Sequence, residues 1–364
     1  MKRSIIIVLS VAFLSIYLSG CGLARTFQCR GRERLEVFNW GEYMDRELIR
    51  SFEEEYNVCV NITTFSSNEI MLTRLQTQSF DLIFPSDYAL EQLASEGGVQ
   101  AINWDLIDFN PNTGFADDLM YMLEYLKEDG FNLLRYGAPY FWGSVGIIYN
   151  KETVNRNELY EHGWNIFHQR VDGRRILFYD SSRDAFMVAL KALGYSSNST
   201  NDREIEAAAE WLREMRRIHG RDVSFLTDEV LEDMPALRHD LALAYSGDAV
   251  FTMTQNDSLG FFKPDATNIW VDAMAIPTDA RNVELAHKFI SFLLQHDNAL
   301  QNTSAIGFSA AVASVYDYVL APGGIFHAFA DAYRVRTSDK DEMFRYLGSA
   351  HGNRLANEWL RITI

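Results

Sequence analysis

A group of aromatic and acidic side chains follows the apolar segment Leu35-Glu-Val-Phe-Asn39. The group consists of Trp40, Glu42 and Tyr43, and the segment before it has the pattern of a short strand. An ammonium over a ring face gains roughly 0.5–2 kcal/mol, and a charge-assisted hydrogen bond to a carboxylate is about twice as strong as a neutral one. The three residues therefore have the chemistry that binds an organic cation, although ordinary surface residues at a strand end would show the same pattern.

A second ring and carboxylate occur together in the apolar run at 268–276. Trp270 and Asp272 are two residues apart, so in a strand both side chains point to the same side of the sheet. An Asp in a buried strand is costly unless its charge is neutralised, which predicts a cation or a set of donors beside Asp272. The alternatives are a wet strand edge or an ion pair with an Arg or Lys of this chain. Tyr245 ends another strand-like run and belongs either to the same site or to the core.

Strand-like and helix-like patterns alternate in the first third of the chain. Apolar periodicity predicts strands at 35–39, 58–62 and 80–84, with helices at 45–56 (capped by Asp45), at about 68–77 and after Ser86. This βαβαβ order favours a parallel sheet. Because ligands bind beyond the carboxyl ends of such strands, Ser86 and Tyr88 are expected near the first group of rings and carboxylates.

A second α/β region follows residue 139. We expect strands at 176–179, 241–245 and 268–276, and helices at 183–193, 202–218 and 283–295. Gly143 and Gly146 lie in a strand-like run at the start of this region, where glycine often marks a bend or a close backbone approach. These two glycines are hinge candidates, and two lobes with a cleft between them are the simplest interpretation.

The N-terminus has the pattern of a secretory signal. Two basic residues precede the apolar stretch Ile5–Leu18, which is short for a bilayer span and ends in small residues. Leu18-Ser-Gly-Cys21 resembles a bacterial lipobox. We therefore expect a lipoprotein signal peptide at 1–20, lipid on Cys21 and a tether at 21–34. The alternatives, an uncleaved anchor or a plain signal peptide, would also export the chain.

Acidic residues outnumber basic ones. The formal net charge of −17 becomes −17 − 2 = −19 once the predicted signal is removed with Lys2 and Arg3. This acidity argues against nucleic acid as a partner and is compatible with a cationic ligand. With lipid on Cys21, the remaining Cys29 and Cys59 are too few for a disulfide framework, so we expect the core to stabilise the fold.

Several longer motifs in the sequence resemble those of a known protein family. They are Phe38–Tyr43, Phe65–Met71, Phe80–Tyr88, Pro139–Gly143, Leu190–Tyr195, Ser246–Ala249 and Trp270–Pro277. In this order, from about residue 35 to about residue 312, they resemble the spermidine/putrescine-binding receptors of bacterial ABC importers, the PotD group. The resemblance implies an α/β, two-lobed periplasmic-binding-protein fold of type II with a ligand cleft between lobes joined by hinge strands. Lobe 1 is then expected at 35–141 and 271–318, and lobe 2 at 142–270 and 319–364.

The same resemblance implies a set of ligand-binding positions. Those that match the family are Trp40, Glu42, Tyr43, Ser86, Tyr88, Trp270 and Asp272, with Asp184 one carbon shorter than the usual Glu. Three more positions depart from it: Ser181 stands where many relatives have Asp, Tyr245 where the ring is often Trp, and Phe308 where Tyr is common. Arg345 stands where some relatives have Gln, and no role is assigned to it.

The function implied by the resemblance is binding without chemistry. The expected protein is a lipid-anchored receptor on the periplasmic side of a bacterial membrane, with putrescine or spermidine as ligand and an ABC permease as partner. No cofactor, metal or nucleic acid is expected. Because Ser181 gives lobe 2 less negative charge than relatives that favour the triamine, we expect putrescine to bind at least as tightly as spermidine.

Two rival interpretations remain. An acidic, aromatic cleft also suits sugars, and paired carboxylates can act in a glycosidase. Against this, Glu42, Asp184 and Asp272 are spread along the chain, each beside a ring, and nothing marks one of them as the acid. The other rival keeps the fold but binds a different small solute or acts as a sensor.

Overall fold

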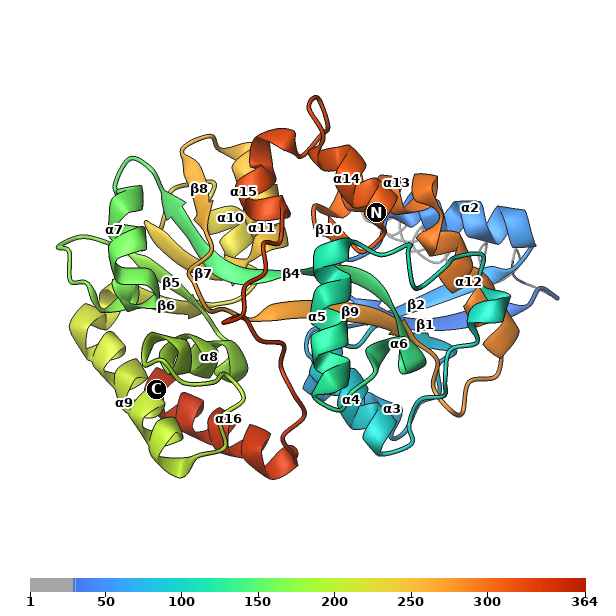
Figure 1. Ribbon diagram of the computed structural model, residues 1–364, viewed down its shortest axis with the longest axis horizontal. Helices are drawn as coiled ribbons and strands as arrows, with labels where there is room; N and C mark the ends of the chain where they lie inside the picture. Colours follow the sequence, from blue (N-terminus) through green and yellow to red (C-terminus); the bar gives the residue numbers. More distant parts are fainter. Residues whose placement is uncertain (1–28, 30) are drawn as a thin grey trace, which may run out of the picture.

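The computed structural model describes Cys29 and residues 31–364. The predicted signal peptide, the predicted lipidation site Cys21 and most of the predicted tether lie outside these residues. Figure 1 shows two lobes of strands covered by helices, with strands that run through both. We call the lobe with the N-terminal strands lobe 1 and the lobe with the C-terminal helix lobe 2. Among the described helices, none combines the length and apolar character needed to span a bilayer.

Lobe 1 begins with the predicted βαβαβ order. β1 (Arg34–Trp40) lies between β2 (Cys59–Phe65) and β3 (Leu82–Ile83) and runs parallel to both. The helices that follow are α2 (Arg46–Tyr56), α3 (Asn68–Leu75) and α4 (Asp87–Ser95). Asp45 accepts a hydrogen bond from the Glu47 amide and caps α2, as predicted. Parallel pairing brings the carboxyl ends of β1 and β3 to one edge, where the residues that follow them meet.

The remaining elements of lobe 1 come from two distant parts of the sequence. They are η1 (Trp104–Leu106), α5 (Asp117–Glu128), α6 (Leu133–Tyr136), α12 (Val283–Leu294), α13 (His296–Ile306), β10 (Ser309–Ala310) and α14 (Ala313–Leu320). In Figure 1 the orange helices α12 and α13 lie beside the blue helix α2, so the chain returns to lobe 1 after building lobe 2.

Two long strands connect the lobes. β4 (Gly137–Asn150), which is buried throughout, pairs antiparallel with β9 (Ile269–Ala275) at its start and with β7 (Leu241–Tyr245) and β8 (Leu259–Phe262) at its end. β9 also pairs with β3 of lobe 1. We call β4 and β9 the connecting strands. The predicted lobe boundaries near 141 and 271 fall on them, and the boundary at 318 falls inside α14; the division into these ranges stays a prediction.

Gly143 is needed where the connecting strands carry a tryptophan. A Cβ at residue 143 would lie 2.7 Å from the Trp270 ring and 2.6 Å from Oγ of Ser246, closer than real Cβ contacts come. The glycine therefore lets the Trp270 ring lie flat against β4. Gly146 has the same relation to the Phe261 ring. Close approach is thus established for both glycines, while their role as hinges stays a prediction.

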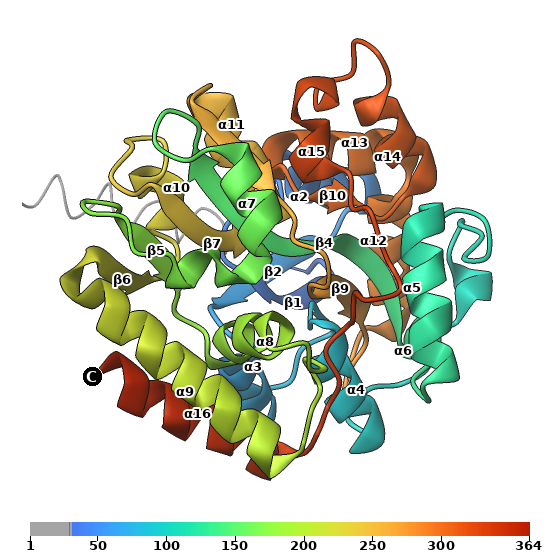
Figure 2. The same cartoon turned by 60° about the vertical axis from the view of Figure 1, so that its left-hand side comes forward.

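Lobe 2 has its own parallel strands. β7 pairs with β5 (Ile176–Tyr179), and β5 pairs with β6 (Val223–Leu226). The bounds of β5 and β7 are those predicted. The other elements are α7 (Arg156–His162), η2 (Gly163–His168), α8 (Ser182–Ala192), α9 (Asp202–His219), η3 (Gly220–Asp222), α10 (Val230–Asp233), α11 (Ser246–Gln255), η4 (His327–Phe329), α15 (Ala330–Tyr333) and α16 (Ser349–Thr363). Figure 2 shows α8, α9 and α16 packed together on one side of the sheet.

An irregular segment, residues 334–348, joins α15 to α16. We call it the strap, and Figure 1 shows it as the red chain that runs between the two lobes. Its middle is fixed to lobe 2: Asp341 pairs with Lys263 at 2.8 Å and accepts from the Thr267 amide, while Glu342 pairs with Lys191 at 2.9 Å. These contacts attach the middle of the strap to lobe 2.

A disulfide joins Cys29 to Cys59, although the sequence did not indicate a disulfide framework. The Cα atoms are 5.8 Å apart and the bond closes a sequence separation of 30 residues. Two cysteines are too few for a disulfide framework, but they can form one disulfide. They come together because Cys29 lies beside β2, and the spacing of the cysteines in the sequence does not reveal this proximity. Loop closure of this size stabilises a fold by about 3–4 kcal/mol. The bond fixes the start of the described chain to lobe 1.

Candidate functional site

Asp272 lies at the centre of the site, on β9. Its side chain is buried, with the residue 5% exposed, and Oδ2 accepts a hydrogen bond from the Tyr43 hydroxyl at 2.7 Å. Oδ1 has no hydrogen-bond partner, and among the described residues no Arg or Lys pairs with Asp272. Burial raises the pKa of Asp272 to about 6, and hydroxyl groups of Ser86 and Tyr43 offset part of that rise. The wet strand edge and the internal ion pair are therefore both excluded.

Asp184 is a second buried carboxylate, at the first turn of α8. Its Oδ2 accepts from the Tyr245 hydroxyl at 3.0 Å, and Oδ1 has no hydrogen-bond partner. Burial raises its pKa above the ordinary value for Asp. Ser181 caps α8 by accepting from the Asp184 amide, so the helix begins where it holds this carboxylate in place.

A row of rings connects the two carboxylates. The Tyr245 ring lies 5.8 Å from Trp270, Trp270 lies 5.5 Å from Phe308, and Phe308 lies 5.3 Å from Tyr43. All three contacts are edge-to-face, and they run from the partner of Asp184 to the partner of Asp272. The buried Trp270 N–H has no hydrogen-bond partner. Because an ammonium group has no acceptor for this N–H, we expect a cationic ligand to contact the face of the Trp270 ring instead.

Other predicted residues lie around this core of the site. Trp40 is half-buried, and its indole N–H donates to the Phe84 carbonyl at 2.8 Å. Ser86 precedes α4, forms a backbone bridge with Asp272 and accepts from the Asn68 amide group at 3.1 Å. These contacts fix the loops that follow β1 and β3, as expected for strand-end residues.

Two predicted residues are not joined to the buried carboxylates. The Glu42 side chain is 91% exposed and pairs with Arg46 at 3.5 Å. The Tyr88 ring is covered by the Arg183 guanidinium, 3.8 Å from the ring centre. Glu42 therefore lies at the rim, and the face of Tyr88 already carries a cation that belongs to the protein.

Sequence reasoning missed two acidic residues. Asp248, three residues after Tyr245, has its pKa raised to about 7, mainly by burial. Asp87 is the first residue of α4, where burial raises its pKa and Oδ2 has no hydrogen-bond partner. Both lie in motifs that carried the family resemblance, and their positions just after strands β7 and β3 were the available signal.

The site can hold a cation at two or more points but shows no arrangement for catalysis. Its raised carboxyl pKa values share one cause, burial, and a cation beside each carboxylate would relieve it. Tyr43 and Tyr245 donate to the carboxylates, and burial raises the pKa of both hydroxyls, so neither is an activated nucleophile. Within the described chain no group of three or more His, Cys, Asp or Glu could hold a metal ion.

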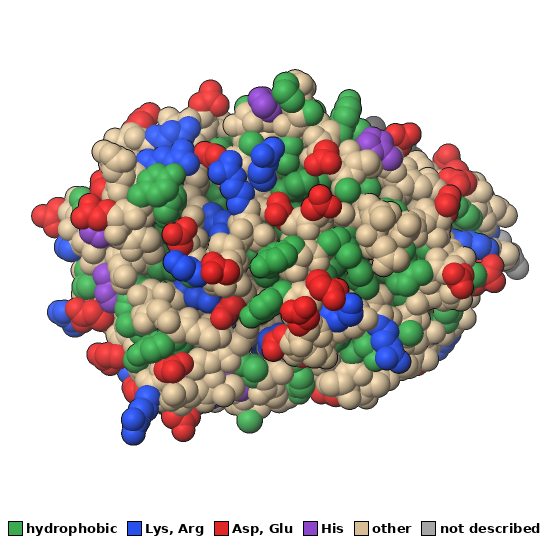
Figure 3. Space-filling view, viewed as in Figure 1, with side chains coloured by type: hydrophobic (Ala, Val, Ile, Leu, Met, Phe, Trp, Pro, Cys, Tyr) green, Lys and Arg blue, Asp and Glu red, His purple; other side chains and the backbone are tan. Residues whose placement is uncertain are grey.

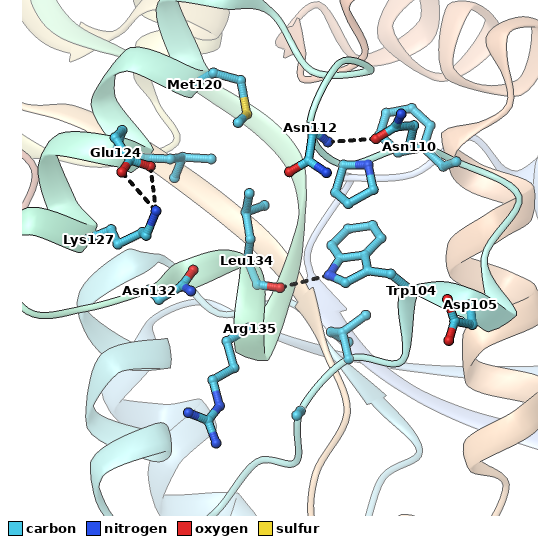
Figure 4. Close-up of a pocket in the computed structure, with 15 residues that line it drawn as sticks. Trp104, Asp105, Asn110, Asn112, Met120, Glu124, Lys127, Asn132, Leu134 and Arg135 are labelled. Atoms are coloured by element: carbon cyan, nitrogen blue, oxygen red, sulfur yellow. Dashed lines mark hydrogen bonds and ion pairs between the residues drawn. The ribbon is translucent and has the colours of Figure 1, made fainter.

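A separate hollow lies on lobe 1. Its volume is about 730 Å³, and Figure 4 shows it between η1 and α5, with the Trp104 N–H bonded to the Leu134 carbonyl and Lys127 paired with Glu124. Each described buried polar atom without a partner lies outside this hollow. Two of these unpartnered atoms belong to Asp184 and Asp272, whose carboxylates accept from Tyr245 and Tyr43, so we place the candidate site there rather than in this hollow.

Two lobes joined by connecting strands, with unpaired buried acceptors between rings, define a solute-binding protein. The chain belongs to the bacterial extracellular solute-binding protein family, whose model matches residues 47–324. The spermidine/putrescine-binding periplasmic proteins of Salmonella typhimurium and Escherichia coli are each 30% identical to it, over 280 residues (76% of this chain, 77% of the relative) and 278 residues (75% and 76%).

A solved structure described as a putative spermidine/putrescine ABC transporter from Listeria monocytogenes has a TM-score of 0.76 and 30% identity. The match covers 91% of this chain and 99% of the Listeria chain. The resemblance to the PotD group and the two-lobed fold, both predicted from sequence, are confirmed. The family and these relatives are solute-binding proteins, so the glycosidase interpretation is wrong.

The raised pKa of Asp272 predicts an unusual effect on stability. A folded-state pKa of about 6, above the ordinary 3.8, means that the stabilising contribution of protonation is complete below pH 4 and is lost as pH rises through 6. In ligand-free protein, Asp272→Asn should therefore raise the free energy of unfolding at pH 8 by up to about 3 kcal/mol and change it little at pH 4. Urea unfolding at both pH values measures this.

Asp265→Asn, at an exposed turn position, serves as the matched control and should change stability at neither pH. If Asp272→Asn instead lowers the free energy of unfolding at pH 8, the ionised carboxylate stabilises the ligand-free fold, and the prediction is wrong.

Proposed function

We propose that this protein binds polyamines, putrescine or spermidine or both, and delivers them to the permease of an ABC importer. One observation carries the proposal: two buried carboxylates, Asp184 and Asp272, each keep one unpaired oxygen, and a row of rings connects them. A polyamine has the complementary pattern, with ammonium groups separated by methylene chains. The names of the relatives support the same ligand class.

Each part of the ligand would meet a matching part of the site. Methylene groups lose water against Tyr245, Trp270 and Phe308, at roughly 0.8 kcal/mol per buried CH₂. Each ammonium forms charge-assisted hydrogen bonds to a carboxylate. A neutral solute of similar length would leave buried carboxylates unpaired, which costs several kcal/mol and gives selectivity. Rotation of the lobes about the connecting strands would then convert occupancy into a shape for the permease.

Removing the charge of either carboxylate should abolish tight binding without unfolding the protein. Asp184→Asn and Asp272→Asn should each weaken putrescine binding by about 2–5 kcal/mol, at least tenfold, because one ammonium loses its buried partner. Calorimetry with a panel of polyamines, sugars and amino acids at one salt concentration measures this, with Asp265→Asn as control. Parent-like affinity in both folded variants, or a parent that prefers a sugar or an amino acid, would falsify the polyamine proposal.

The charges of lobe 2 support a preference for the shorter amine. Asp184 supplies a carboxylate, whose charge Arg183 partly offsets, and Asp248, whose pKa burial raises to about 7, carries only part of a negative charge at neutral pH. Ser181 adds no charge, although an Asp there could cap α8 equally well. We therefore expect putrescine to bind at least as tightly as spermidine, and Ser181→Asp to shift the preference toward spermidine by roughly 1 kcal/mol or more. Paired titrations of both amines decide this, and a clear spermidine preference in the parent protein contradicts it.

We also propose that lipid on Cys21 holds the receptor at the periplasmic side of a membrane. The relatives are named periplasmic proteins, and the disulfide at Cys29 suits an oxidising compartment outside the cytoplasm. Cys21→Ser should release the protein from membranes and prevent fatty-acid labelling. Unchanged partition and labelling would show that Cys21 is not the lipid site.

A further inference from the structure

Two arginines of lobe 2 reach the same helix of lobe 1. Arg183, at the start of α8, lies over the Tyr88 ring at 3.8 Å. Arg345, on the strap, donates through Nη2 to Oε1 of Glu91 at 2.6 Å and through Nε to Oε2 at 3.0 Å. Tyr88 and Glu91 are three residues apart on α4 and so share a face of that helix.

The two arginines are also joined to one another. Nη1 of Arg183 donates to the Arg345 carbonyl at 3.5 Å, and the Phe344 ring lies beneath the Arg183 guanidinium and edge-on to Tyr88. Side chains from α8, the strap and α4 thus form one contiguous cluster across the gap between the lobes. Figure 3 shows acidic and basic side chains close together below the middle of the molecule, where the lobes meet.

The backbone around Arg345 belongs to lobe 2. The Arg345 amide donates to Oδ1 of Asn198 at 2.9 Å, and Nδ2 of Asn198 donates to the Met343 carbonyl at 2.8 Å. The Arg345 side chain crosses to lobe 1, where it also reaches the Asp129 carbonyl at 2.8 Å, beyond the end of α5, and the neighbouring Tyr346 amide donates to Glu91 of lobe 1. Separation of the lobes would therefore break the contacts of the Arg345 side chain and of the Tyr346 amide with lobe 1, and leave the two hydrogen bonds with Asn198 intact.

The Arg345–Glu91 pair is largely withdrawn from water. The side chains are 17% and 14% exposed, and Glu91 accepts a further hydrogen bond from the Tyr346 amide at 2.8 Å. A bidentate pair with its remaining acceptor capacity filled is the geometry in which attraction repays desolvation. Beside it a hollow of about 400 Å³ is lined from both lobes, by Tyr125 and Asn198 among others.

We propose that Arg183 and Arg345 form an arginine clasp that holds the two lobes together without a ligand. The partners of Arg345 are Glu91 and Asp129 rather than the carboxylates of the cleft, so Arg345 is a positioning residue that acts through lobe closure. The clasp sets the fraction of ligand-free molecules whose cleft is closed. Because apparent affinity scales with that fraction, the clasp sets the affinity for every ligand by the same factor. The affinity part of this inference rests on the proposed polyamine function.

The test separates lobe closure from ligand contact. Arg345→Met removes the guanidinium, and Arg345→Met with Glu91→Met removes both charges, so that no unpaired carboxylate is left buried. Arg361→Met is the control, because Arg361 pairs with Glu358 within lobe 2. Spin labels at Glu128→Cys on α5 and Arg203→Cys on α9 report the distance between the lobes by pulsed electron resonance.

Without ligand, the parent and Arg361→Met should give the same short distance, and both Arg345 variants should shift to longer distances. Putrescine and spermidine should each bind the Arg345 variants at least fivefold more weakly, with their affinity ratio unchanged within about twofold. An unchanged ligand-free distance overturns the clasp, and so does an altered affinity ratio, which would place Arg345 on the ligand. If the parent binds no polyamine, the proposed function fails, while the ligand-free distances still decide the clasp.

Discussion

Burial of acidic side chains without a counter-charge is the constraint on which the rest of this structure depends. Asp184 and Asp272 each keep one oxygen that no described residue bonds, and burial holds the pKa of Asp272 near 6. Leaving such groups unpaired costs several kcal/mol, which a fold selected for stability alone would avoid. The cost is consistent with a site completed by a cation that the protein does not supply.

The architecture explains how the cost is confined to one place. Trp270 and Asp272 lie on β9, which pairs with β4 and with β3 of lobe 1. Gly143 of β4 leaves room for the Trp270 ring. Rings fill the distance between the carboxylates, so that water is replaced by apolar surface rather than by another charge. Of the protein's own cations, Arg345 pairs with Glu91 of lobe 1, and Arg183 lies over the Tyr88 ring and offsets only part of the effect that burial has on the pKa of Asp184.

Local sequence patterns were sufficient for the elements whose ends carry the site. Apolar runs bounded by polar turns gave β5 and β7 their observed bounds, and Asp45 marked the start of α2. Local patterns could not predict which distant residues lie close together in the fold. The disulfide between Cys29 and Cys59, for example, depends on how the residues before β1 lie against β2. Position at a strand end also does not fix side-chain direction. Glu42 lies in a turn with φ of 47° and faces solvent, whereas Asp248, to which no role was assigned, is held near Tyr245.

The most direct test of the central claim is a crystal structure of the protein grown with putrescine. Density for the diamine is expected along the row of rings, with one nitrogen within about 3 Å of Oδ1 of Asp272 and the other within about 3 Å of Oδ1 of Asp184. Both orphan oxygens would then be paired. A diamine bound only in the hollow beside Trp104, or a cleft that stays empty at saturating putrescine, would contradict the claim that these carboxylates exist to receive a cation.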